Sequence, residues 1–238
     1  MPRFKINSEN IIENNVQISG EDYKHIVKVL RMKVDDNIML FDSKGYEYDC
    51  VIKKISKDDL QAEILTNDEI NRESPLNVTL FQAIIKGDKM DLIVQKATEL
   101  GVTDIYPIIT ERSEVKNTNK IPRWQKIADE SIKQCGRSIS PIIRPELNFK
   151  YIFEQNKSDL NLIFYEIEEN SSIKEVLVSD QIKSVSLIIG PEGGFTINEV
   201  KLATDNDFIT VGLGKRILRA ETASIVAITL IQHYFGDI

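Results

Sequence analysis

A chain of 238 residues with 42% apolar residues is long enough for one large domain or two modest ones with real hydrophobic cores. Its 30 Lys and Arg residues against 37 Asp and Glu give a net charge of −7, which argues against non-specific nucleic-acid binding by the whole surface. The two cysteines form no CxxC pair and the two histidines have no neighbouring ligands, which argues against a disulfide framework and a metal site. No apolar run approaches the roughly 20 residues that span a bilayer, and the first residues lack an apolar signal core, so we expect a cytoplasmic protein that does not enter a membrane.

Residues 1–72 carry short strand-like runs separated by turn residues, which predicts a small β barrel or sandwich. One helix interrupts this pattern. Ser19 resembles its N-cap, and an apolar stripe runs along it at helical spacing. The residues of this stripe are Tyr23, Ile26, Val27 and Leu30, and the residues mainly off it are Lys24, His25, Lys28 and Arg31.

The polar stretch 67–74, ending at Pro75, is the best candidate linker, because strands and helices alternate beyond it. We therefore expect two domains, 1–72 and 73–238, the second of α/β class. Its predicted strands cover 76–85, 104–109, 160–165, 185–189 and 208–211, and its predicted helices include 90–97 closed by Gly101, 122–135, one capped by Thr196 with Glu199, and 222–235. The last helix is apolar on almost every side, so the core or a second subunit must cover it.

Two glycine-bearing segments, 188–195 and 213–223, each follow a predicted strand. Loops after parallel strands emerge at the sheet edge where α/β proteins bind ligands. Gly190, Gly193 and Gly194 would let a ligand approach main-chain amides, although a tight strand-to-helix turn explains them equally well. The segment matches neither GxGxxG nor GxxxxGK[ST], so dinucleotide or triphosphate binding loses its usual support.

The second segment places three cations, Lys215, Arg216 and Arg219, beside a glycine turn. Exposed cations there could bind a phosphate group of a ligand. The alternative is a solvated loop in which Glu221 favours the helix N-terminus through the macrodipole.

Taken together, the sequences IGPEGGF and LGKRILRAETA resemble the signature of the RsmE family of 16S ribosomal RNA uridine-N3 methyltransferases, within the SPOUT superfamily. The resemblance extends over the whole chain. It includes the HxxxVLR-like segment 25–31, the helix 86–100, and the segments 124–128 and 134–137, with Lys133 as a minor departure.

This resemblance implies a PUA-like β barrel that binds RNA, followed by a SPOUT methyltransferase domain whose C-terminal segments form a trefoil knot. It further implies a homodimer through the C-terminal helix, S-adenosylmethionine as cofactor, and methylation of N3 of a specific uridine in the decoding region of 16S ribosomal RNA. The substrate is expected to be the assembled small ribosomal subunit. The cofactor-binding residues that it implies are Tyr165, Glu166, Ile189, Gly190, Pro191, Glu192, Gly193, Gly194, Leu213, Gly214, Ile217, Leu218, Thr222 and Ala223.

Methylation at N3 requires the loss of a proton, and the resulting negative charge spreads onto the flanking carbonyl oxygens, where a cation would help. Arg219 is the first candidate for that cation and Arg112 the second. Glu221 or Glu192 could accept the proton, but each could instead cap a helix or orient an arginine.

RNA contact must come from local cationic clusters because the total charge is acidic. The expected contacts are Lys24, His25, Lys28, Arg31, Arg137, Lys215 and Arg216, with Lys86 and Lys89 before a long helix as further cations. His25 could instead pack on the β domain, and Trp124 fits the core or a dimer interface better than a stacking platform.

Two alternatives to a methyltransferase stay open from the sequence. One is an RNA-binding adaptor that kept the fold and lost catalysis, against which the intact glycine loops and Arg219 argue. The other is a Rossmann-type nucleotide enzyme, against which the absent fingerprint argues.

Overall fold

The computed structural model of the protein describes residues 1–155, 158–168, 171, 173–176 and 182–238. Its contacts divide the chain into two compact units. The first unit comprises Met1–Glu73 with Ile132–Ile139, and the second comprises Ser74–Ser131 with Ser140–Ile238. The segment Ile132–Ile139, which the sequence-based division placed in the second domain, thus belongs to the first unit. Among the described residues, no helix is long and apolar enough to cross a membrane.

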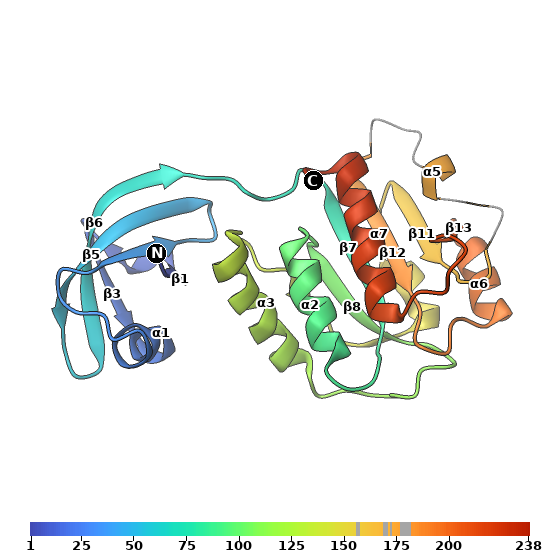
Figure 1. The fold of residues 1–238 in the computed structure, drawn as a ribbon, viewed down its shortest axis with the longest axis horizontal. Coiled ribbons are helices and arrows are strands. Elements are labelled where there is room, and N and C mark those ends of the chain that lie inside the picture. Colours follow the sequence, from blue (N-terminus) through green and yellow to red (C-terminus); the bar gives the residue numbers. More distant parts are fainter. Residues whose placement is uncertain (156–157, 169–170, 172, 177–181) are drawn as a thin grey trace. The chain divides into compact units, whose positions relative to one another are not determined.

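The first unit is built on one six-stranded mixed sheet with the order β1-β4-β5-β6-β3-β2. Only β1 and β4 pair in parallel within it. Its strands are β1 (Arg3–Lys5), β2 (Ile11–Ile12), β3 (Asn15–Ser19), β4 (Asn37–Phe41), β5 (Tyr46–Ile55) and β6 (Asp59–Glu69), and a short 3₁₀ turn lies at Ser8–Asn10. The register of β5 and β6 has irregularities, and these long strands are bent (Figure 1). A single sheet excludes the two-sheet sandwich, and β6 extends into the stretch that the sequence marked as linker.

The helical segment of the first unit is shorter than its apolar stripe predicts. It consists of α1 (Gly20–Lys24) followed directly by a π turn (His25–Val29). Tyr23 and Ile26 are buried, and the Tyr23 hydroxyl donates to the carbonyl oxygens of Ser56 and Lys57 at 2.8 and 2.9 Å. Leu30, the C-cap of the π turn, is 41% exposed, which corrects its place in the predicted stripe.

A buried ion pair also holds the first unit together. The Glu47 carboxylate accepts hydrogen bonds from the guanidinium groups of Arg3 and Arg72, and its own side chain is 5% exposed. Burial alone would raise the pKa of Glu47, but the hydrogen bonds and charges of the two arginines outweigh it and hold that pKa below its ordinary value of 4.5. The folded state therefore favours the ionised carboxylate.

The second unit is built on a parallel sheet with the order β10-β8-β7-β12-β11-β13, to which β9 adds beside β8. The strands are β7 (Asn77–Ala83), β8 (Asp104–Ile109), β9 (Ile142–Ile143), β10 (Leu147–Asn148), β11 (Leu160–Phe164), β12 (Ser184–Ile189) and β13 (Ile209–Val211). The helices are α2 (Lys89–Glu99), α3 (Ile121–Cys135), α4 (Ile152–Gln155), α5 (Ile173–Val176), α6 (Ile197–Thr204) and α7 (Ala220–Phe235), with a 3₁₀ turn at Phe149–Tyr151; the end of α3, from Ile132, belongs to the first unit. This α/β architecture agrees with the predicted class.

Helices cover both faces of the parallel sheet because its strands are apolar on both sides. Successive residues of β7 show the alternation. Leu80 packs in the cluster that contains α2, α3 and α7, whereas Phe81 packs in the cluster with α4 and α6. Figure 1 shows α2, α3 and α7 side by side on one face. Trp124 of α3 is 1% exposed, which confirms its assignment to the core.

Local signals placed several boundaries correctly. Gly101 has φ +84° after α2, and Thr196 with Glu199 forms the predicted capping box of α6. The predicted strand 104–109 coincides with β8.

The Glu47→Gln variant is expected to lose about 1–3 kcal/mol of unfolding free energy, because charged hydrogen bonds to two arginines are removed at a buried site. Since the folded pKa of Glu47 is depressed, its stabilisation is present above pH 4.5 and is lost as the pH falls through the folded pKa. Denaturant melts at several pH values should show that the free energies of unfolding of the variant and the wild type become more similar as the pH falls. The matched control is Glu63→Gln, which breaks the exposed pair with Lys53 and should cost no more than about 1 kcal/mol; equal losses would contradict the role of Glu47.

Candidate functional site

A cavity of about 370 Å³ lies at the carboxyl ends of three adjacent strands of the second unit. β11 runs between β12 and β13 in the parallel sheet, so the loops that follow these strands emerge side by side. The residues that line the cavity are Lys89, Phe164, Tyr165, Glu166, Ile189, Gly190, Pro191, Glu192, Gly194, Val211, Leu213, Gly214, Arg216, Ile217, Leu218, Arg219, Ala220 and Ala223.

The loop after β12 presents its main chain to the cavity because its glycines have no side chain to cover it. Gly194 donates its N–H to the carbonyl oxygen of Pro191 at 3.0 Å and has φ +66°. A Cβ atom at Gly194 would overlap the carboxylate of Glu166, and one at Gly190 would lie 3.0 Å from the ring of Phe195. The backbone conformation at 194 therefore favours glycine, and the exposed carboxylate of Glu166 lies where a Cβ atom would be.

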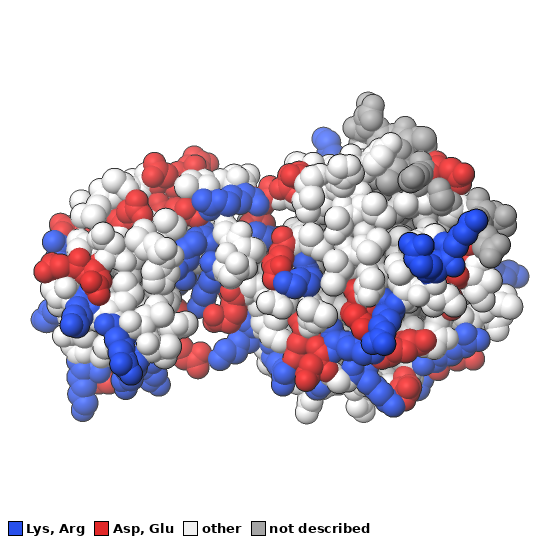
Figure 2. Space-filling model, in the orientation of Figure 1, with Lys and Arg blue, Asp and Glu red and all other residues white. Residues whose placement is uncertain are grey.

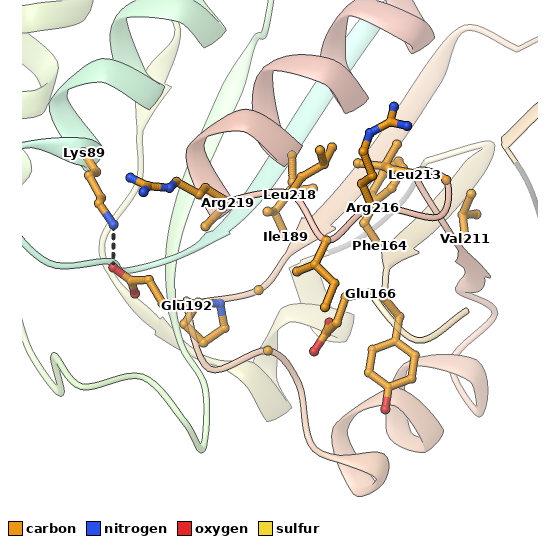
Figure 3. Close-up of a pocket in the computed structure, with 18 residues that line it drawn as sticks. Lys89, Phe164, Glu166, Ile189, Glu192, Val211, Leu213, Arg216, Leu218 and Arg219 are labelled. Carbon is orange, nitrogen blue, oxygen red and sulfur yellow. Dashed lines mark hydrogen bonds and ion pairs between the residues drawn. The ribbon is translucent and has the colours of Figure 1, made fainter. Parts of the chain in front are cut away.

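The loop after β13 supplies the apolar part of the site. Gly212 donates its N–H to the carbonyl oxygen of Ser171 at 3.0 Å, which fixes the start of this loop. Beyond it, Leu213 and Leu218 are partly buried and lie on the cavity with Ile189 (Figure 3). These side chains give the cavity an apolar wall opposite the carboxylate of Glu166.

Charged side chains gather at one end of the cavity. The Lys89 ammonium lies 3.3 Å from Glu192 and 3.9 Å from Glu221. Figure 3 shows the Arg219 guanidinium extending toward Lys89, with Glu192 facing that lysine. The Oε2 atom of Glu221 is buried and has no hydrogen-bond partner. Two cations and two carboxylates thus gather at this end of the cavity.

The structure brings together most of the cofactor-binding residues expected from the sequence. Twelve of them line the cavity: Tyr165, Glu166, Ile189, Gly190, Pro191, Glu192, Gly194, Leu213, Gly214, Ile217, Leu218 and Ala223. Gly193 and Thr222 do not line it. Of the expected catalytic residues, Arg219 lines the cavity and Glu221 lies behind it, against Lys89.

Arg112, the second expected catalytic cation, has another position. Its guanidinium donates to the carbonyl oxygens of Gly193 and Phe195, at 3.0 and 3.2 Å, and it does not line the cavity. This corrects the expectation of direct contact with a reacting group. Arg112 instead braces the first glycine loop from outside.

The residues expected to contact RNA fall in three places. Lys24, His25, Lys28 and Arg31 are exposed on the first unit, where Figure 2 shows Lys and Arg gathered over the region of α1. Lys215 and Arg216 are exposed on the loop after β13, and Arg216 also lines the cavity. The expectation that Arg137 contacts RNA is corrected. Its side chain is only 6% exposed and pairs with Glu73 at 2.8 Å, which leaves it no free surface for RNA.

Sequence reasoning missed four residues that line the cavity: Lys89, Phe164, Val211 and Ala220. Phe164 and Val211 are the last residues of β11 and β13 and lie at the ends of predicted strands or one residue before, so the rule that ligands bind at strand ends could have found them. Lys89 had been noted only as a cation before a helix. Its approach to Glu192 joins positions about one hundred residues apart, which no local pattern reveals.

This geometry defines an α/β protein that binds a small ligand largely through main-chain groups at the carboxyl ends of parallel strands. Family models match the chain at residues 72–232, described as an RNA methyltransferase domain, and at residues 18–65, described as an RNA methyltransferase PUA domain. The ribosomal RNA small subunit methyltransferase E of Buchnera aphidicola is 36% identical over all of this chain and 95% of the relative. The protein of that name from Bacillus subtilis is 37% identical over 91% of this chain and 89% of the relative.

Solved structures agree with these relatives. The methyltransferase E of Neisseria gonorrhoeae, bound to S-adenosylmethionine, has a TM-score of 0.90 at 36% identity, over 100% of this chain and 99% of that one. A Legionella pneumophila protein in complex with the same cofactor has a TM-score of 0.91 at 34% identity, over 99% of this chain and 98% of that one. The chain belongs to the ribosomal RNA small subunit methyltransferase E family, as its signature segments indicated.

The Gly194→Ala variant is expected to be destabilised by roughly 1–2 kcal/mol, the cost of a left-handed backbone conformation for a residue with a Cβ atom. The exposed Glu166 carboxylate, which the new Cβ would overlap, can turn aside into solvent. Thermal melts should therefore give nearly the same midpoint for Gly194→Ala and for the double variant that adds Glu166→Ala. A large recovery in the double variant would show that Glu166 does constrain the loop.

Proposed function

We propose that this protein transfers a methyl group from S-adenosylmethionine to N3 of a specific uridine in the decoding region of 16S ribosomal RNA, within the assembled small subunit. The observation that carries the proposal is the cavity walled by the main chain of 189–194 and 213–218. Membership of the methyltransferase E family and two cofactor-bound structural neighbours support it.

The residues of the cavity fit S-adenosylmethionine. Its volume lies within the roughly 300–1,000 Å³ typical of small-molecule sites. Ile189, Leu213 and Leu218 offer apolar contact for an adenine ring, and the glycine at 194 leaves main chain open to a ligand. The carboxylates of Glu166 and Glu192 suit a ligand that carries positive charge. When bound, this cofactor supplies the activated methyl group and leaves as a neutral thioether.

The protein's part in catalysis is then to position the uracil ring and to accept the proton that leaves N3. Arg219 and Lys89 are the cations placed to stabilise negative charge on the carbonyl oxygens that flank N3. Glu192 lines the cavity and Glu221 does not, so Glu192 is the better placed acceptor for the N3 proton.

We assign RNA binding to residues 1–72 and methyl transfer to residues 73–238. The exposed cations Lys24, Lys28 and Arg31, with His25 beside them, support the first assignment because phosphate contacts need accessible positive charge. The edge of the His25 ring also packs against Phe4, at 5.8 Å between ring centroids, so His25 serves the fold as well.

We further propose that the segments after β12 and β13 form the trefoil knot implied by the family signature, and that α7 mediates a homodimer. Along α7, Ala227, Ile228 and Ile231 are fully buried, whereas Leu230 is only partly covered and Tyr234 is 55% exposed. Because α7 is apolar on almost every side, its exposed apolar side is expected to pack against a second subunit. A cytoplasmic location follows from the substrate, since small ribosomal subunits are found there.

Small subunits isolated from cells that lack the protein should gain 3-methyluridine when incubated with the purified protein and S-adenosylmethionine, as measured by mass spectrometry of digested nucleosides. Arg219→Ala should bind the cofactor with unchanged affinity in calorimetry but form the product about 10²–10³-fold more slowly, because charge stabilisation is lost. Lys201→Ala, which removes a surface charge on α6, is the control. Absence of 3-methyluridine with wild-type protein would refute the proposed reaction, and normal turnover by Arg219→Ala would remove that residue from it.

The Glu192→Gln variant should lower kcat by about 10²–10⁴-fold, because the amide keeps the side chain's size but cannot accept a proton. Glu221→Gln is the matched control and should retain most activity, since Glu221 does not line the cavity. Single-turnover rates across a range of pH values would separate the two. A larger loss for Glu221→Gln than for Glu192→Gln would reverse the assignment of the acceptor.

A further inference from the structure

The turn that follows β8 is held in place by its own hydroxyl groups. The main-chain N–H of Thr110 donates to the hydroxyl oxygen of Ser113 at 3.1 Å, and the main-chain N–H of Ser113 donates to the carbonyl oxygen of Thr110 at 3.2 Å. The two hydroxyl groups lie 2.8 Å apart, and both residues are 2% exposed. Because these polar groups are buried, a change of the turn would leave some of them without a partner. The turn is therefore a rigid support for Glu111 and Arg112, which lie within it.

Arg112 connects this turn to the loop after β12. Its guanidinium donates to the carbonyl oxygens of Gly193 and Phe195, and Gly194, the residue between them, lines the cavity. A Cβ atom added to Gly193 would lie 3.2 Å from the Cβ atom of Arg112, so the main chain of the loop lies directly against the arginine. Arg112 therefore holds the main chain on both sides of the residue that faces the cavity.

Glu199, which is 8% exposed, makes a second connection between the same two segments. In the capping box of α6, its Oε2 atom accepts the main-chain N–H of Thr196 at 2.9 Å and the hydroxyl of Thr196 at 3.1 Å. A capping box uses only one carboxylate oxygen in this way. The other oxygen, Oε1, accepts the main-chain N–H of Glu111 at 2.8 Å. One buried carboxylate thus joins the start of α6 to the turn after β8.

The placement of Arg112 favours a role in ligand binding over a role in folding alone. Arg112 is exposed, and the interactions of exposed charged side chains contribute little to the stability of a fold. The loop that it holds has glycine at 190, 193 and 194, and glycine adopts more backbone conformations than other residues. Such a loop loses conformational entropy when a ligand binds, unless other groups already hold it in the bound conformation.

We propose that Arg112 and Glu199 are positioning residues for the cofactor, which hold residues 193–196 in the conformation that binds S-adenosylmethionine. Neither side chain lines the cavity, so both act through the main chain of the loop. The inference rests on the proposed function for its cofactor and does not depend on which RNA is methylated. The two residues set the affinity for the cofactor and leave the transfer step to the charged groups at the end of the cavity.

Removal of the Arg112 side chain tests the first connection. Arg112→Ala should raise the Kd for S-adenosylmethionine about tenfold in calorimetry, because the loop must then become ordered on binding. Its melting temperature without the cofactor should stay close to that of the wild type, and the rise in melting temperature on adding the cofactor should be smaller. Arg112→Lys, which keeps a charged donor, should recover part of the affinity. The matched control is Arg144→Ala, which removes an arginine that pairs with Asp104 at the opposite end of β8 and should leave the Kd unchanged.

Replacement of the Glu199 carboxylate tests the second connection. In Glu199→Gln one acceptor oxygen becomes an NH₂ group, so one main-chain N–H loses its partner, and the Kd for the cofactor should again rise about tenfold. Asp159→Asn is the matched control, because the Asp159 carboxylate accepts main-chain N–H groups of Lys183 and Ser184 at the opposite end of β12. Both variants should lower the melting temperature, and only Glu199→Gln should weaken cofactor binding.

Turnover of small subunits separates positioning from catalysis. Arg112→Ala should raise the KM for the cofactor and keep kcat near that of the wild type, the reverse of the pattern expected for Arg219→Ala. A wild-type Kd in both Arg112→Ala and Glu199→Gln would overturn the inference and leave the proposed function standing. Equal rises in Kd for Arg144→Ala and Asp159→Asn would also overturn it, since a general loss of stability would then explain the effect. If the wild-type protein binds the cofactor but methylates no subunit, the proposed reaction fails, and calorimetry on the same variants still decides this inference.

Discussion

The left-handed backbone at Gly194 is the constraint on which the first glycine loop depends, because glycine adopts φ +66° without strain. This turn brings the loop after β12 close to Glu166, which lies just beyond the neighbouring strand β11. Glycines at 190, 193 and 194 carry no side chain, so the loop can expose its main chain to the cavity. Arg112 holds the outer side of the same loop by donating to two of its carbonyl oxygens.

Although the net charge is negative, the cations of this protein are grouped in places where they could contact RNA. The cations are local: one group lies on the first unit around α1, and another meets Glu192 and Glu221 at the end of the cavity. This arrangement gives a cofactor-sized site with carboxylates and, beside it, surfaces that attract phosphate.

Much of the fold was predictable because its signals are local. Capping residues, apolar alternation and glycine stops placed β8, α2 and α6 close to their observed bounds. The prediction was wrong at Leu30, which is exposed, because the spacing of an ideal α-helix does not anticipate the change to a π turn after Lys24. It was also wrong about Arg137, since a cation in a basic stretch looks the same in sequence whether it faces solvent or an ion-pair partner such as Glu73. The family signature identified most of the cavity residues, but not Lys89.

The sequence by itself determined the alternation of strands and helices, the family, and the glycine loops at the strand ends, because periodicity and spacing are properties of neighbouring residues. Only the tertiary structure decided which charged groups meet. Lys89 approaches Glu192 and Glu221, and Arg112 reaches Gly193 rather than the cavity. Glu199 likewise accepts the N–H of Glu111, which joins the start of α6 to the turn after β8. These contacts depend on the order of strands in the sheet, which pairs residues far apart in the chain and leaves no trace in local sequence.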